Sequence, residues 1–392
     1  MKTQKMLKRT WAEVNLDNLA HNVAVLREKL PEGCKFLGVV KADGYGHGAV
    51  PVARELEGLG AEFLAVSNFE EALQLRRGEI HLPILILGYT PPEFARDEAA
   101  LQITQEVHSL EYGKQLSQAL LGSGMQLDIH MKIDTGMSRL GFFADDREET
   151  VPELIELAAL PGLRTTGIFM HFAVSDTPDE EDYTQLQHRR FMGVVDALRT
   201  RGVDPGIVHC ANSGATIAYP QFALDMVRPG IATYGLDPSG ALHGMADLRP
   251  LMTLKTTIGA IRPFDPGITV SYGRTYTTPD HRVIAVCPIG YADGLPRRLS
   301  NQISFLLHGK AVPVVGRICM DMCMVDITQV PEAQVGDTVT VIGADGDRQV
   351  TWDDWADQLG TISYELLCGI NKRVPRVYFR GGEPVDRLQY IV

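Results

Sequence analysis

Residues 35–48 read Lys-Phe-Leu-Gly-Val-Val-Lys-Ala-Asp-Gly-Tyr-Gly-His-Gly, an apolar run that ends in a lysine and then breaks into glycines. An unbroken apolar run is typical of a parallel strand that is buried on both faces, so we predict a strand that ends at Val40. Lys41 would then lie where α/β enzymes hold their chemistry, and a lysine near apolar walls can become a Schiff-base nucleophile. The alternative is a surface lysine that caps the strand, because charged residues are usually exposed.

Short apolar runs alternate with longer segments of helical periodicity from residue 35 to about residue 229, which is typical of repeated βα units. Leu16, Leu19, Val23 and Leu26 indicate a helix before the first strand. Eight strands are predicted, at 36–40, 63–66, 84–87, 103–107, 127–133, 167–170, 207–210 and 226–228. This number of units predicts an α/β fold with an N-terminal (β/α)8 barrel of the TIM type.

The pattern changes after about residue 243 to short strands separated by turn residues. We expect strands at 253–261, 281–286, 311–315, 323–327 and 338–342, a helix at 352–359 and a final strand at 374–378. The predicted domains are therefore a barrel over residues 12–243 and a β-rich domain over residues 244–392. Residues 1–11 are expected to pair with the β-rich domain.

Charge and composition exclude several classes of partner. The net charge of −12 and the lack of clustered Lys and Arg argue against nucleic acid. No run of about 18 apolar residues could span a bilayer, and the start of the chain lacks the apolar segment of a secretory signal, so a cytoplasmic protein is expected. The six cysteines are scattered, which predicts free thiols and no metal site.

Polar residues follow several of the predicted strands. In a barrel the carboxyl ends of the strands share one face, so these residues should lie together. Each alone has a structural explanation, since a single histidine is more often a satisfied core residue. Loops after the seventh and eighth strands often bind phosphate, which favours Ser213, Gly230 and Ile231. The full set at the strand ends is Lys41, Lys132, His171, Asn212, Ser213 and Arg228.

The string from Lys41 to Gly48 resembles the pyridoxal-phosphate motif of the alanine racemase family. The resemblance runs from Trp11-Ala12-Glu13-Val14 to Tyr364-Glu365, nearly the whole chain. It implies that Lys41 holds pyridoxal 5'-phosphate covalently and is also one of two catalytic bases. The cofactor-binding residues it implies are Lys41, Tyr45, His171, Asn212, Ser213, Arg228, Gly230, Ile231 and Tyr364.

Arg228 is the most informative of these residues. A guanidinium beside the pyridine nitrogen would discourage protonation of that nitrogen and make the ring a poorer electron sink. A weaker sink favours return of the proton to Cα, which suits a racemase. The resemblance implies that His171 supports Arg228 by a hydrogen bond. A surface ion pair is the alternative, but the apolar neighbours of Arg228 predict burial.

Racemisation needs a base on each face of the substrate. The segment Val270-Ser271-Tyr272-Gly273 resembles the family segment that supplies a catalytic tyrosine, although the residues alone would suit a tyrosine packed beside a turn. The resemblance also implies a homodimer with shared active sites and a carbamylated Lys132 that is hydrogen-bonded to Arg139. The residues implied at the substrate are Arg139, Tyr291, Met320 and Asp321.

Two positions depart from the family pattern, Ser138 where glycine is usual and Met322 where glutamine is common. Both could change the Arg139 turn or the substrate pocket. The resemblance implies racemisation of L-alanine to D-alanine for peptidoglycan, and a racemase of serine or of a broader amino-acid range is the alternative. Two further classes compete, a decarboxylase on the same fold, against which Arg228 argues, and a carrier that binds the cofactor without turnover.

Overall fold

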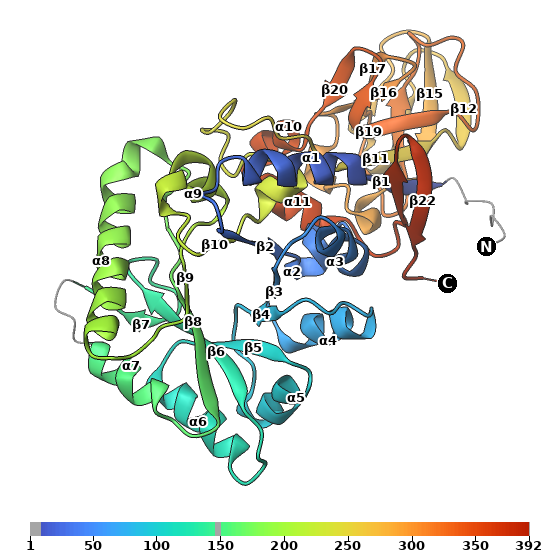
Figure 1. Ribbon diagram of the computed structural model, residues 1–392. Helices are drawn as coiled ribbons and strands as arrows, with labels where there is room; N and C mark the ends of the chain where they lie inside the picture. The colour runs from blue at the N-terminus through green and yellow to red at the C-terminus, as the bar shows by residue number, and fades with distance from the viewer. Residues whose placement is uncertain (1–8, 146–149, 392) are drawn as a thin grey trace. The chain divides into compact units, whose positions relative to one another are not determined.

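The computed structural model describes residues 9–145 and 150–391 (Figure 1). By their contacts these residues form two compact units. The barrel unit comprises Leu19–Tyr45 and Ala49–Arg249, and the β unit comprises the described parts of Met1–Asn18 and Pro250–Val392 together with Gly46–Gly48. Most of the predicted pairing segment 1–11 lies outside the described residues.

A ring of parallel strands forms the barrel unit and confirms the predicted barrel. The spatial order is β10-β2-β3-β4-β5-β6-β8-β9. Between β9 and β10 there is no ladder, but the N–H of Asp225 donates to Val208 O at 3.1 Å and the N–H of Arg228 to Ala211 O at 2.8 Å, so the ring is nearly closed. The strands are β2 (Lys35–Val39), β3 (Phe63–Val66), β4 (Ile84–Ile86), β5 (Ile103–Val107), β6 (Leu127–Asp134), β8 (Leu163–Phe169), β9 (Ile207–His209) and β10 (Met226–Val227), with β7 (Phe142–Phe143) beside β6.

Helices connect these strands, and in Figure 1 α4 to α8 lie along the outside of the ring. Local sequence explains where they begin: Asn68 caps α4 and Ser109 caps α6, each side chain accepting a backbone N–H of the first turn. One face of each helix is buried, as Leu116 and Leu120 show in α6. The helices are α1 (Leu16–Arg27), α3 (Ala49–Gly58), α4 (Phe69–Arg77), α5 (Ala95–Ala100), α6 (Leu110–Leu120), α7 (Val151–Ala158), α8 (Glu181–Thr200) and α9 (Ser213–Ala218).

The β unit contains one large sheet and two smaller ones. The large sheet has the order β17-β16-β19-β11-β1-β21-β22, with β20 paired to β19; the smaller ones are β12-β15-β18 and β13-β14. Two helices, α10 (Trp352–Leu359) and α11 (Ser363–Gly369), complete the unit. The strands are β1 (Thr10–Asn15), β11 (Met252–Thr257), β12 (Ala260–Phe264), β13 (Thr269–Val270), β14 (Tyr276–Thr277), β15 (Arg282–Cys287), β16 (Ser304–Leu307), β17 (Lys310–Pro313), β18 (Cys323–Asp326), β19 (Thr338–Asp345), β20 (Arg348–Val350), β21 (Arg376–Arg380) and β22 (Glu383–Leu388).

Two strand predictions in this unit were wrong. The segment 253–261 is not one strand but two, β11 and β12, because the chain leaves the large sheet near Gly259 and enters the three-stranded sheet. The strand predicted at 374–378 is not the last one. Gly381 and Gly382 both have positive φ and turn the chain back into β22, which pairs antiparallel with β21.

Gly46 contributes a close backbone contact inside the β unit. Its φ is +80°, and a Cβ there would lie 2.2 Å from the carbonyl oxygen of Leu367 on α11. We expect Gly46→Ala to lower the free energy of unfolding by about 2–4 kcal/mol, because both the backbone conformation and the contact are lost. Denaturant titration followed by circular dichroism measures the change.

The matched control is Gly369→Ala, since Gly369 ends α11, its φ is not positive and a Cβ there would meet no atom within 4 Å. This variant should unfold close to the wild type. Equal stability of the two variants would contradict the expected clash at Gly46.

Candidate active site

Lys41 stands at the carboxyl end of β2, as predicted, and opens a left-handed turn (α2, Lys41–Tyr45). Ala42, Asp43 and Gly44 have φ values of 51°, 56° and 61°. For residues with a side chain this conformation costs about 1–2 kcal/mol each. It is held by hydrogen bonds from the Gly44 N–H to Val40 O at 2.9 Å and from the Ala42 N–H to the Glu71 carboxylate at 2.8 Å. The strained turn fixes the direction in which the chain leaves the lysine.

Four of the predicted cofactor-binding residues converge in the barrel unit. The hydroxyl of Ser213 accepts the backbone N–H of Gly230 at 2.8 Å and that of Ala232 at 3.2 Å. A Cβ on Gly230 would lie 2.6 Å from the Tyr45 hydroxyl oxygen. Ile231, which is buried, begins the 3-10 helix η4 (Ile231–Tyr234). Tyrosine and serine hydroxyls therefore lie beside a place where glycine leaves room, and hydroxyl donors of this kind suit a phosphate group.

Asn212 has a structural role in this region. Its side-chain oxygen accepts the Ala215 N–H at 3.0 Å and the Ser175 hydroxyl at 2.8 Å, so it caps α9 directly before Ser213. The cap fixes the start of the helix and with it the position of the serine.

Arg228 is buried, as predicted. Its guanidinium donates to Met170 O at 2.7 Å, to Cys210 O at 3.1 Å and to Nδ1 of His209 at 2.8 Å. Among the described residues it forms no ion pair with a carboxylate, and burial lowers its pKa to about 10. The guanidinium thus stays charged at neutral pH without an acidic partner, so it suits a ligand with a hydrogen-bond acceptor.

The predicted hydrogen bond between His171 and Arg228 was wrong, because the imidazole that contacts Arg228 belongs to His209. His171 nevertheless lies among the positive groups of the site. Burial and then the charges of Arg228, Lys132, Arg139 and Lys41, in that order, lower the pKa of His171 well below its usual value. The predicted lysines and arginines therefore create one electropositive region.

Lys132 is almost fully buried in β6. Burial and then Arg228 lower its pKa to about 7, and its amine donates to Ile133 O at 3.3 Å. Among the described residues this amine makes no hydrogen bond with Arg139. The backbone N–H of Arg139 donates to the carboxylate of Asp134. Ser138 has a φ of 56°, in the left-handed region that favours glycine, which explains why glycine would suit this turn. The neutral form of an amine is the one that reacts with carbon dioxide, and the lowered pKa increases its share. Carbamylation of Lys132 stays a prediction.

The depressed pKa of Lys132 predicts a trend of stability with pH. An unfolded lysine titrates near 10.4, so between about pH 7 and pH 10 the unfolded chain binds more protons than the folded one, and stability rises with pH. The cost of burying this amine is therefore largest below about pH 7 and becomes smaller as pH rises toward 10. In buffers free of carbon dioxide, Lys132→Met should therefore be most stable relative to wild type below pH 7, and this advantage should shrink by pH 10. Thermal unfolding across this range tests it.

The exposed Lys114 provides the comparison, since its amine pairs with Glu156 at the surface. A Lys114→Met variant should not show the same rise. A flat difference between wild type and Lys132→Met would contradict the proposed neutral amine.

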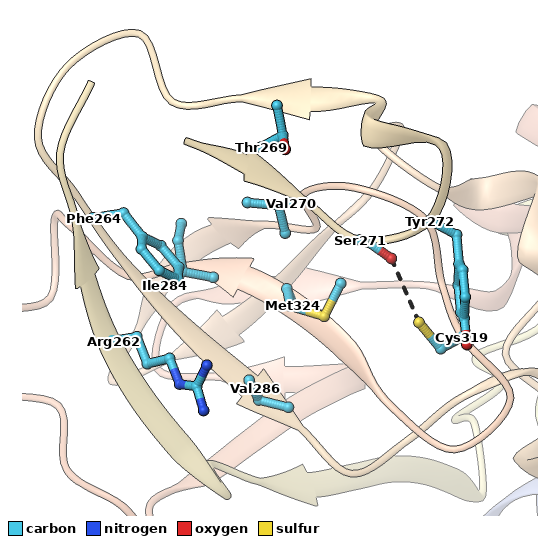
Figure 2. A pocket seen from close by; sticks show the side chains of 10 residues that line it. All are labelled: Arg262, Phe264, Thr269, Val270, Ser271, Tyr272, Ile284, Val286, Cys319 and Met324. Atoms are coloured by element: carbon cyan, nitrogen blue, oxygen red, sulfur yellow. Dashed lines mark hydrogen bonds between the residues drawn. The ribbon is translucent and has the colours of Figure 1, made fainter. Parts of the chain in front are cut away.

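Tyr272 occupies a strained turn of the β unit, the 3-10 helix η5 (Tyr272–Arg274). Ser271 before it has a φ of 65°, and the Ser271 hydroxyl lies 2.6 Å from Arg317 O and 3.4 Å from the Cys319 sulfur. Figure 2 shows Tyr272 and Cys319 at one end of a cavity of about 440 Å³. The tyrosine is 70% exposed, so its phenol is available to another molecule.

The predicted substrate residues of the β unit are joined by backbone hydrogen bonds. The N–H of Tyr291 donates to Cys319 O, and the N–H of Ala292 donates to Met320 O, both at 3.0 Å. Arg373 bridges the buried Asp293 and the exposed Asp321 at 3.1 and 2.9 Å. Tyr291 and Met320 are 42% and 52% exposed, and Met322 is exposed beside them. Tyr364 is half-buried on α11.

The sequence reasoning missed His130 and His209. Both are buried in strands, and the ring of His130 lies 2.9 Å from that of His209 between Nδ1 and Nε2. A period-two signal was present, since Asp128, His130, Lys132 and Asp134 alternate with apolar residues along β6. Polar residues on the inner side of a barrel strand could have been read as part of the site.

The described residues contain no cluster of His, Cys, Asp and Glu that could hold a metal ion. All six cysteines are free thiols. Within residues 9–145 and 150–391, no helix has the length and apolar character needed to cross a membrane.

Residues 14–238 match the family model described as "Alanine racemase, N-terminal domain", and residues 251–378 match "Alanine racemase, C-terminal domain". The chain belongs to the alanine racemase family. It is similar to alanine racemase 2 of Caldanaerobacter subterraneus subsp. tengcongensis, with 44% identity over 385 residues that cover 98% of each chain. Membership of this family makes the chain an enzyme of the isomerase class.

Solved structures of the alanine racemase family agree with this assignment. A structure of alanine racemase from Clostridium difficile 630 superposes with a TM-score of 0.94 at 42% identity, covering 99% of this chain and 100% of that one. A histidine racemase from Leuconostoc mesenteroides subsp. sake has a TM-score of 0.86 at 30% identity, covering 96% and 100%. Relatives with this architecture therefore include one named as an alanine racemase and one named as a histidine racemase.

Proposed function

We propose that this enzyme interconverts L- and D-alanine with pyridoxal 5'-phosphate held covalently on Lys41. The observation that carries the proposal is the buried guanidinium of Arg228, which has no carboxylate partner among the described residues. A decarboxylase would need a carboxylate at the cofactor ring to strengthen the electron sink. Arg228 would instead bring a positive charge to the ring, which weakens the electron sink and supports racemisation over decarboxylation.

The residues of the barrel unit fit the cofactor. Its phosphate would be held by the hydroxyls of Tyr45 and Ser213 and by the loop at Gly230 and Ile231, where a Cβ would obstruct the approach. Arg228 would face the ring nitrogen, and His171 and Asn212 would line the site. Tyr364 is a further phosphate contact that the family resemblance implies. The electropositive region suits an anionic ligand.

When bound, pyridoxal phosphate withdraws electrons from the substrate Cα and makes its hydrogen acidic. Arg228 would discourage protonation of the ring nitrogen and so limit the withdrawal. The amine of Lys41 takes or returns a proton on one face of Cα, and the phenol of Tyr272 does so on the other. Arg139 and the Met320–Asp321 segment would hold the carboxylate, with Tyr291 beside them, and Tyr364 would favour a small side chain.

A homodimer with shared active sites is part of this proposal. Tyr272 and the Met320 segment would reach the barrel of a second copy of the chain. The exposed fractions of Tyr272, Tyr291 and Met320 support a role in contact with another molecule. Carbamylation of Lys132 would place a negative charge near Arg139 and orient the arginine.

The test of the reaction is incubation of the purified enzyme and cofactor with L-alanine, L-serine, L-lysine and L-histidine, followed by chiral chromatography. We expect the highest kcat/KM with alanine. A higher value with serine, or similar values with several amino acids, would support the alternative of a serine or broad-range racemase.

Two other outcomes would overturn racemisation itself. Release of carbon dioxide from a basic amino acid would identify a decarboxylase, and a yellow cofactor complex without turnover would identify a carrier. Use of the D-alanine in peptidoglycan and a cytoplasmic location stay predictions. Rescue of a bacterial strain that requires D-alanine would support the first.

A further inference from the structure

A row of three buried side chains crosses the interior of the barrel unit, from His130 on β6 through His209 on β9 to Arg228. Nδ1 of His130 lies 2.9 Å from Nε2 of His209, and Nδ1 of His209 lies 2.8 Å from the Arg228 guanidinium. Both imidazoles are fully buried and Arg228 is 4% exposed. The row ends at the group that would face the cofactor ring.

Each hydrogen bond of the row requires one particular tautomer of the imidazole that makes it. A guanidinium can only donate, so Nδ1 of His209 must carry a lone pair. Neutral His209 then bears its proton on Nε2 and donates it to Nδ1 of His130, which must also be bare. Neutral His130 therefore carries its proton on Nε2. These tautomers follow from the network of partners.

The last N–H of the row has no acceptor. Nε2 of His130 is buried without a hydrogen-bond partner among the described residues. Gly167 on β8 leaves space for this ring, because a Cβ there would lie 2.5 Å from Cε1 and Nε2 of His130. A buried donor without a partner costs about 1–3 kcal/mol, which an apolar side chain at this position would avoid. Packing alone thus does not explain the histidine.

Protonation of either imidazole would break the row. A cationic His209 would present an N–H to the Arg228 guanidinium, and a cationic His130 would present one to His209. Burial first, and then Arg228, lower the pKa of His130 to about 3 and that of His209 well below its usual value. Lys132 adds to the lowering of the His209 pKa, and among the described residues its amine donates to Ile133 O and to neither imidazole.

We propose that His130 is a positioning residue, whose bare Nδ1 holds His209 in the one tautomer that can accept from Arg228 and so fixes the guanidinium toward the cofactor nitrogen. The inference rests on the proposed function, since it concerns the restraint that Arg228 places on the electron sink. Loss of the acceptor on His130 would loosen Arg228 and permit stronger electron withdrawal by the ring.

Two variants separate this role from packing. His130→Leu removes the hydrogen-bond acceptor for His209. His130→Asn keeps an acceptor, because the asparagine side-chain oxygen can lie near the former position of Nδ1. His188→Leu is the matched control, because His188 is a half-buried barrel histidine that stacks on Phe222 at 4.0 Å and touches no member of the row. Thermal unfolding shows whether each variant is folded.

Four measurements follow on the full chain. Nitrogen-15 NMR of histidine-labelled protein without added cofactor reports the His209 tautomer, and borohydride reduction after cofactor addition reports attachment to Lys41. Absorbance of the bound cofactor reports its electronic state. Pyruvate release counts turnovers in which the amino group of alanine passes to the cofactor, leaving the cofactor as its amine and alanine as pyruvate.

We expect His130→Leu to show both His209 tautomers, a shifted absorbance band and about tenfold more pyruvate per racemisation, as loss of roughly one hydrogen bond implies. His130→Asn and His188→Leu should stay within about twofold of wild type in that ratio. Suppose that borohydride labels Lys41 in wild type, but His130→Leu keeps a single His209 tautomer and the wild-type ratio of pyruvate to racemisation. The role of His130 is then wrong, and the proposed function stands. If wild type takes no cofactor on Lys41, the proposed function fails first.

Discussion

Replacement of Lys41 by alanine is expected to abolish racemisation, with a loss of at least about 10⁴-fold in kcat/KM. The variant loses the covalent anchor of the cofactor and one of the two bases together. The left-handed turn after Lys41 is held by the Val40 carbonyl and the Glu71 carboxylate through backbone N–H groups, which the substitution leaves in place. The fold should therefore survive, and the loss can be assigned to the amine.

Borohydride reduction and peptide mapping provide the second measurement. Wild type should carry the reduced adduct on Lys41, and the variant should carry none. Lys35→Ala is the matched control, because Lys35 begins the same strand that ends beside Lys41 and should leave both readouts unchanged. An adduct on a different lysine, or activity that survives in Lys41→Ala, would contradict the proposal.

Much of the barrel could be predicted from the sequence, because parallel strands that are buried on both faces consist of continuous apolar runs. All eight predicted runs are strands, with ends displaced by a few residues. The position of Lys41 follows from the same signal, since an apolar run that stops at a charged residue marks the strand end. The turn beyond it could not be predicted, because Ala42 and Asp43 rarely adopt positive φ and do so here through contacts made elsewhere in the chain.

The β unit was harder because its pairings are distant in sequence. Ala12 of β1 pairs with Leu254 of β11 on one side and with Arg376 of β21 on the other, and no local pattern states this. The partner of Arg228 was missed for a related reason. The order of polar residues within a strand shows which side chains point inward, but the distance between His209 and Arg228 depends on how β9 and β10 close the ring.

Tyr272→Phe is expected to separate the two faces of the substrate. The substitution removes the phenolic hydroxyl and retains the ring, so proton exchange at Cα should fall by about 10²–10⁴-fold for one enantiomer of alanine. Exchange of the other enantiomer depends on Lys41 and should persist. Proton NMR in D₂O follows the Cα hydrogen of each enantiomer separately. The strained turn at Ser271 positions the tyrosine through its backbone and the Ser271 hydroxyl, neither of which the variant changes.

Tyr276→Phe is the matched control, because Tyr276 lies in β14 just beyond the same turn and is only partly exposed. Its exchange rates should remain within about twofold of wild type, since no role in proton transfer is proposed for it. Equal loss for both enantiomers in Tyr272→Phe would point to damage of the whole site. Unchanged exchange for both would show that a different group serves the second face, and the exposed position of Tyr272 would then need another explanation, such as a role in subunit contact.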